Sequence, residues 1–253
     1  MRKQFYILSL IITQLSFAQT TLSNGNLSTG STTKSNVSAP SGYTWSELQN
    51  DSGNTSQANT LFGPACFNTD SYNSFFVADD FIIPTNQTWN ITAIDFFAYQ
   101  TGYNGTTSPI NAVRVKILNG NPNSVTSTSV FGDDTTNRYV SSEDSKIYRV
   151  DNTQVPFQTT PGQSRKRWKI KANVPKTLTS GTYWIQYQFE NIVKSNGGFC
   201  PPVTIVGSRS LPIFNAKQFN AVGNLWSDIK DEGNPISAPD VPVAMPFVIT
   251  YTT

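Results

Sequence analysis

The sequence contains no histidine. This absence excludes a Ser-His-Asp triad, a Cys-His pair, a histidine general base, and zinc or copper sites with imidazole ligands. Only two cysteines are present, Cys66 and Cys200, and their wide separation rules out a CxxC redox or zinc motif. The chain therefore lacks the groups on which many hydrolases, thiol enzymes and metalloenzymes depend.

Glutamate is scarce as well, and occurs only at positions 47, 143, 190 and 232. These residues do not form the E-x-D-x-E arrangement of jelly-roll β-glucanases. The Arg, Gln, His and Tyr signatures of jelly-roll alginate lyases are missing too. With no catalytic motif left, we expect a protein that is not an enzyme. A hydrolase or lyase that uses Asp or Tyr alone stays open as a distant alternative.

No segment beyond the N-terminus has a helical period of useful length. Short apolar runs separated by turn residues, as in the alternating stretch 111–118, indicate strands. The pattern predicts an all-β fold, a single antiparallel β-sandwich of jelly-roll type over residues 43–253. The expected core includes Val113, Val115, Ile117, Trp168, Ile170, Ile185, Tyr187 and Phe247.

The N-terminus has the features of a secretory signal peptide over residues 1–18. Arg2 and Lys3 precede an apolar run from Phe5 to Phe17, and small residues precede a cut before Gln19. We expect a secreted protein, located outside the cell, in the periplasm or on the outer-membrane surface. Residues 19–42, rich in Ser, Thr, Asn and Gly, are expected to form a flexible leader.

Charge and hydropathy limit the partners of the exported chain. Loss of Arg2 and Lys3 takes the number of basic residues from 18 to 16, against 16 acidic residues. A neutral chain argues against nucleic acid or an anionic membrane surface as a bulk partner. No later apolar run is long enough to span a bilayer, so we expect no membrane span.

Three stretches resemble a known family. They are "VADDFIIPTNQTWNITAIDFFAYQTG", "VRVKILNGNPNSVTSTSVFGDDTTNR" and "LTSGTYWIQYQF", with "GNLW" and "MPFVIT" near the end. They are similar to secreted β-sandwich modules of Bacteroidetes and other environmental bacteria. The hallmark of these modules is an Ala-Asp-Asp-Phe stretch followed by a Trp-x-(Ile/Val) strand. The resemblance implies fold and export, and it implies no activity.

One predicted hairpin supplies candidate ligand contacts. Residues 165–173 and 183–190 alternate, and "VPKTLTSG" between them is expected to turn. Their apolar sides would face the core, and their other sides would form one outer surface. The candidate contacts on that surface are Trp184, Gln186, Gln188, Arg167 and Lys169, to which we add Trp226 from the loop-like "NLWSDIKDEGN". The alternatives are a solvated face and, for Trp226, a plug at one end of the sandwich.

These residues favour a non-catalytic binding module for extracellular or cell-surface polysaccharide, because aromatic rings stack on sugar faces while amides and charges bind hydroxyl groups. The alternative is a structural or adhesive module that contacts a surface protein partner. Exposed aromatic side chains along a groove would favour the first function. A flat polar surface with every tryptophan buried would favour the second.

Adjacent acids raise the question of a metal. Asp79 and Asp80 would point to opposite faces of a strand, so a catalytic pair is disfavoured and a structural role is the first interpretation. Calcium is the second, because hard oxygen ligands are abundant. Asp133 and Asp134 would join such a site only if they converge on the first pair. No cofactor other than this structural calcium is expected.

The two cysteines are predicted to form a disulfide. An exported chain meets oxidising conditions, and Cys66 and Cys200 allow only one pairing. Both lie in loop-like surroundings next to proline. The alternative is a pair of separate, buried free thiols.

Overall fold

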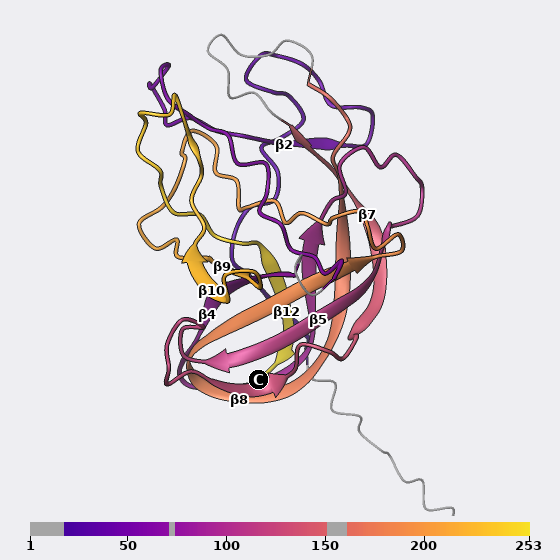
Figure 1. Cartoon of the computed structure of the whole chain (residues 1–253), viewed down its shortest axis with the longest axis vertical. Helices are drawn as coiled ribbons and strands as arrows, with labels where there is room; N and C mark the ends of the chain where they lie inside the picture. Colours follow the sequence, from indigo (N-terminus) through magenta and orange to yellow (C-terminus); the bar gives the residue numbers. More distant parts are fainter. Residues whose placement is uncertain (1–17, 71–73, 151–160) are drawn as a thin grey trace, which may run out of the picture.

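Two long strands organise the fold. β4 (Phe75–Ala98) and β8 (Lys166–Asn191) pair antiparallel from Val77 opposite Tyr187 to Ala98 opposite Trp168. The computed structural model describes residues 18–70, 74–150 and 161–253. In Figure 1, β8 sweeps in a broad curve around one end of the molecule.

The pair of strands bends near its middle. Ile83 lies opposite Gly181 and Thr88 opposite Thr179, so several β4 residues face a single β8 residue. At this irregularity Asn86 has a φ of 66°. Bulges of this kind increase the local twist and turn a strand from one layer into another. Pro84 is tolerated here because the ladder is already interrupted.

The predicted hairpin within residues 165–190 is wrong. The stretch "VPKTLTSG" continues β8, and each half of β8 pairs with β4 instead of with the other half. Strand alternation was assigned correctly, but the strand that each segment pairs with was not. The partner is set by contacts that are distant in sequence.

The bend divides one ten-stranded sheet into two facing layers. The first layer contains β10 (Leu225–Asp228), β9 (Lys217–Asn220), the first half of β4, the second half of β8, β5 (Ile110–Asn119) and β6 (Thr128–Gly132). The second contains β1 (Thr20–Ser23), β12 (Phe247–Thr252), the other halves of β4 and β8, β7 (Tyr139–Val150) and β2 (Thr44–Glu47). A small separate sheet pairs β3 (Ala58–Asn59) with β11 (Gly233–Asn234).

This architecture confirms an all-β, antiparallel, sandwich-like single domain, in which β2 and β7 are a parallel pair. The described residues include no helix. Accordingly, these residues contain no helix that is long and apolar enough to cross a membrane.

The core lies between the two layers. Alternate side chains of both halves of β4 and β8 meet there with those of β5 and β12. The rings of Phe96 and Tyr187 stack across it, with centroids 4.2 Å apart. The predicted core is confirmed, because the following residues are all buried: Val113, Val115, Ile117, Trp168, Ile170, Ile185, Tyr187 and Phe247.

The expected flexible leader is wrong as well. Residues 20–23 form β1, which pairs with β12, and Leu22 packs against the core. Gly30 bridges to Trp45 farther along this segment. The polar composition concealed this role, because an edge strand contributes backbone hydrogen bonds whatever its side chains are. The domain therefore begins before residue 43. The predicted signal peptide lies outside the described residues, apart from Ala18.

Candidate functional site

Asp79 lies on the core side of β4, between Val77 and Phe81, and is buried. Its Oδ2 accepts a hydrogen bond from the backbone N–H of Met245 at 2.6 Å, and its Oδ1 accepts one from the N–H of Asp80 at 2.9 Å. The side-chain amide of Asn215 lies beside both carboxylates, and with its nitrogen turned toward them it donates to Oδ1 of Asp79 and of Asp80, at 3.1 and 3.3 Å. The carboxylates thus fasten neighbouring segments to β4.

Burial controls the ionisation of this pair. Desolvation raises the pKa of Asp79 to about 7, although the N–H groups of Met245 and Asp80 act to lower it. Desolvation also raises the pKa of Asp80, against the hydrogen bond from Asn215. Asp79 faces the core and not a cleft, so this geometry suits a structural carboxylate.

Asp133 and Asp134 do not join Asp79 and Asp80. Asp133 closes a turn by accepting the N–H groups of Thr135 and Thr136 at 2.9 and 2.6 Å. Asp134 pairs with Lys116 at 2.5 Å. Across the described ranges, no three His, Cys, Asp or Glu side chains form a group that could hold a metal ion. The expected calcium site is therefore not assembled from these four aspartates.

The proximity predicted for the two cysteines is present, but the disulfide is not. Cys66 and Cys200 are buried free thiols. A β-bridge between Ala65 and Phe199 brings their segments together, and each thiol interacts with the other. Burial raises the pKa of the Cys200 thiol, and the hydrogen bond with Cys66 is the second cause of this rise.

The predicted ligand surface is split between two faces. Arg167 and Lys169 lie on the outer side of the second layer, while Trp184, Gln186 and Gln188 lie on the outer side of the first. Expecting these residues to share one exposed surface was wrong, because β8 bends between the two sets.

Most of these side chains are also covered. Trp184 is 5 % exposed and Arg167 is fully buried. Desolvation lowers the pKa of Arg167 to about 9, and repulsion from the charge of Arg149 lowers it further as the smaller cause.

The other candidates already have partners within the protein. The side-chain amide of Gln188 donates to the backbone carbonyls of Phe67 and Phe75 and to the hydroxyl of Ser74. Lys169 forms an ion pair with Glu143.

Trp226 is partly exposed, and aromatic side chains that the sequence did not single out lie beside it. Phe219 on β9 lies opposite both Phe76 on β4 and Trp226 on β10. The three rings form an aromatic row across the outer side of the first layer, with centroids 6.2 and 5.4 Å apart. Phe219 and Trp226 are half-buried. Trp226 also packs on the cluster that contains Trp184, so the row is rigid.

A polar pocket of about 390 Å³ opens near the aromatic row, because its wall includes Ser74, two residues before Phe76. Ser74 and Glu190 continue the outward alternation of Phe76 and Gln188, so the pocket opens on the same face. Arg114 and Lys194 pair with Glu190 at 2.9 and 3.2 Å. The pocket is lined by Asn68, Thr69, Asp70, Ser74, Glu190, Lys194 and Ala221.

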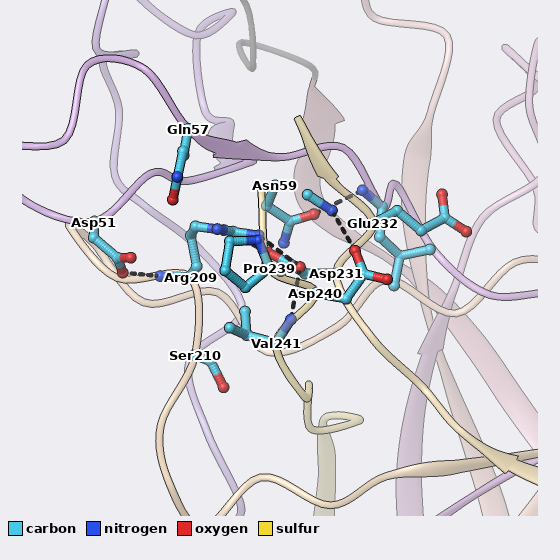
Figure 2. Close-up of polar contacts among 12 residues, drawn as sticks. Asp51, Gln57, Asn59, Arg209, Ser210, Asp231, Glu232, Pro239, Asp240 and Val241 are labelled. Carbon is cyan, nitrogen blue, oxygen red and sulfur yellow. Dashed lines mark hydrogen bonds and ion pairs between the residues drawn. The ribbon is translucent and has the colours of Figure 1, made fainter. Parts of the chain in front are cut away.

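The end of β10 is fixed by a buried ion pair, drawn in Figure 2. Arg209 donates from Nε and Nη2 to the carboxylate of Asp231 at 2.7 and 2.9 Å, and also to the carbonyl of Pro239. Asp231 accepts the N–H of Val241 in addition. The strand that carries Trp226 is therefore held at its far end by a rigid loop.

The sequence offered a weak signal for this site. The turn-like "NAVGN" between "KQF" and "LW" is typical of a hairpin with aromatic residues on both arms. No family model, curated protein or solved structure gave a match to this chain.

Proposed function

We propose that the protein is a secreted, non-catalytic binding module for extracellular or cell-surface polysaccharide. The observation that carries this proposal is the aromatic row of Phe76, Phe219 and Trp226 beside the polar pocket. An apolar ring face next to converging polar groups suits a sugar, which has C–H-rich faces and a rim of hydroxyl groups.

The chemistry of the pocket supports recognition without a reaction. Glu190 forms ion pairs with Arg114 and Lys194. Their hydrogen bonds lower the pKa of Glu190, first of all the one from Arg114, and they outweigh burial, which acts to raise it. A carboxylate kept ionised in this way accepts hydrogen bonds from hydroxyl groups but is a poor general acid. Ser74, Asn68 and Thr69 add neutral donors and acceptors.

A second candidate function is adhesion through protein contacts. Val222 and Leu225 are 67 % and 61 % exposed on the turn and edge strand beside Trp226. Exposed apolar side chains on an edge strand suit contact with a surface protein partner.

The deciding experiment is a glycan-array and polysaccharide pull-down screen of the chain that begins at Gln19. We expect retention on at least one polysaccharide and a loss of roughly ten-fold or more in affinity for Trp226→Ala, since stacking residues dominate such sites. The matched control is Val222→Ala, which removes an exposed apolar group from the adjacent turn. Glycan binding that survives Trp226→Ala would show that the aromatic row is not the glycan site. No glycan binding, together with protein capture that needs Val222, would favour the second function.

Export is part of the proposal, and it would expose Cys66 and Cys200 to a thiol oxidant of the compartment outside the cytoplasm, such as another protein's disulfide, which would take up the two electrons and two protons that the neighbouring thiols lose. The disulfide between Cys66 and Cys200 would tie the segment before β4 to the segment after β8. We expect neither cysteine of the secreted protein, unfolded without reductant, to react with a thiol reagent. Full labelling of both would show that the thiols stay free.

A further inference from the structure

A second cavity lies away from the aromatic row, at the start of β8. It has a volume of about 350 Å³ and is lined by Asn104, Tyr148, Gln163, Ser164 and Lys166. We call it the lysine pocket. Tyr148 on β7 and Lys166 on β8 are direct cross-strand partners, so both side chains project from the same face.

Lys166 stands where the core face of β8 ends. It continues the inward alternation of Trp168 and Ile170, but it is followed on that face by a cavity instead of apolar packing. The residue is 9 % exposed. Its Nζ donates to the carbonyl of Gly105 at 3.2 Å and lies 5.6 Å from the centre of the Trp168 ring. The ammonium group is thus held in place by a neutral carbonyl and an aromatic ring.

Within the part of the chain that the structure describes, Asp144 is the carboxylate that pairs with Lys166, and it does not balance the positive charge around the pocket. Asp144 accepts hydrogen bonds from the Tyr43 hydroxyl at 2.5 Å and from the N–H and Nζ of Lys146 at 2.8 and 3.3 Å. It lies 3.8 Å from Lys166 Nζ. Burial acts to raise the pKa of Asp144, but the donors outweigh it and the pKa is lowered. One carboxylate therefore faces two ammonium groups.

The aromatic wall beside the pocket is preorganised. The rings of Tyr43 and Tyr148 stack with centroids 4.8 Å apart and an interplanar angle of 26°. Trp45 packs against Tyr148 from another side. A wall that is already ordered costs a ligand little conformational entropy on binding.

We propose that the lysine pocket binds the anionic group of an acidic saccharide, either the carboxylate of a uronic acid or a sulfate ester. Among the described residues, Asp144 leaves part of the ammonium charge of Lys166 and Lys146 unbalanced, and this excess supplies the attraction. Neutral polar groups come from Asn104, Gln163 and Ser164, and Tyr148 supplies the wall. This inference rests on the proposed function and adds the ligand class, since the aromatic row by itself does not select charge.

The test uses the chain that begins at Gln19 and isothermal titration with glucuronate, glucose 6-sulfate and glucose. We expect at least one anion to bind more tightly than glucose, and binding to weaken as salt is raised. The glucuronate and sulfate arms show which anion the pocket accepts. Lys166→Gln should lower anion affinity about ten-fold, while the control Lys230→Gln, an exposed lysine after β10, should leave it unchanged.

A second variant covers the case in which Lys166→Gln disturbs folding. The side chain of Lys146 is 58 % exposed, and Lys146→Gln should weaken anion binding a few-fold while leaving the thermal midpoint near that of the wild type. Anion affinity no higher than that for glucose, or unchanged in both variants, would overturn the proposal.

Trp226→Ala separates this inference from the proposed function. We expect it to weaken binding of neutral polysaccharide and to spare the small anions. Anion binding that is lost in Trp226→Ala but kept in Lys166→Gln would place the anion on the aromatic row. That result would overturn the lysine pocket and leave the polysaccharide-binding proposal standing.

Discussion

Asp79 places a carboxyl group on the core side of β4, where Met245, Asp80, Asn24 and Asn215 supply its hydrogen-bond donors. These contacts join β4 to the start of β12 and to the loop before β9. Desolvation still dominates, and it raises the pKa of Asp79 to about 7. The hydrogen bonds of Asp79 stabilise the fold, but ionisation of its buried carboxyl group destabilises the folded state.

The stability of the protein should fall as pH rises from about 4 to about 7, because the pKa of Asp79 is raised to about 7 in the folded state. The unfolded pKa of Asp79 is about 3.9, so between about pH 4 and 7 the folded state binds its proton more tightly. The free energy of unfolding is then highest below the unfolded pKa and is lost as pH rises toward the folded value, by up to about 4 kcal/mol. Urea unfolding at pH 5 and pH 8 measures the part of this loss that falls above pH 5, about 3 kcal/mol, and Asp79→Asn should largely remove it.

The control for Asp79 is Asp228→Asn. The Lys217 contact lowers the pKa of Asp228, so this group titrates below the tested window. Its replacement should leave the difference between pH 5 and pH 8 as in the wild type. A wild-type difference that persists in Asp79→Asn would assign it to another group.

The buried pair of Arg209 and Asp231 makes a second prediction for single residues (Figure 2). Their side chains are 3 % and 0 % exposed. Asp231→Ala should lower the free energy of unfolding by roughly 3–5 kcal/mol, because it leaves a buried guanidinium without its carboxylate. Arg209→Met combined with Asp231→Leu should recover much of that loss. Chemical unfolding measures both, and a cost below about 1 kcal/mol for the single variant would contradict the prediction.

At the scale of elements, β8 shows which features the sequence could predict. Alternation correctly placed Trp168 and Ile170, and also Ile185 and Tyr187, on the core side. It could not identify the strand beside them, because a strand has the same alternation whichever neighbour it pairs with. The turn-like "VPKTLTSG" therefore suggested a hairpin, where the chain instead follows the bend of β4.

The N-terminal element is part of the sheet, so its removal should destabilise the protein. Asn24, directly after β1, donates to the carbonyl of Met245 and accepts the N–H of Phe247, both at 2.7 Å. Asn24→Ala should lower the free energy of unfolding by about 1–3 kcal/mol, since it leaves these partly buried groups unpaired. A chain that begins at residue 43 loses β1 too and should unfold at a lower temperature still.

Thermal unfolding of the chains that begin at residues 19 and 43 compares these outcomes. The control is Ser23→Ala, which changes an exposed side chain of β1 and keeps its backbone pairing with β12. Equal midpoints for the two chains would mean that the segment is dispensable, as a flexible leader would be.

At the scale of the whole molecule, the candidate site was less predictable than the fold. Trp226 was found because a tryptophan in a loop-like stretch stands out, whereas Phe219 resembles any core phenylalanine in the sequence. Trp184 alternates outward as predicted, yet Trp226 covers it. Exposure depends on what lies over a face, and strand alternation determines only which face a side chain occupies.

The two layers should unfold together because β4 and β8 run through both. Loss of one layer would leave half of each long strand without its neighbours and expose the shared core. Far-UV circular dichroism and tryptophan fluorescence should therefore give coincident transitions. Ile185→Val in the first layer and Ile170→Val in the second should each lower both midpoints together, at about 0.5–1.5 kcal/mol. Transitions that separate in either variant would show that the bend between Ile83 and Thr88 acts as a boundary between two independent units.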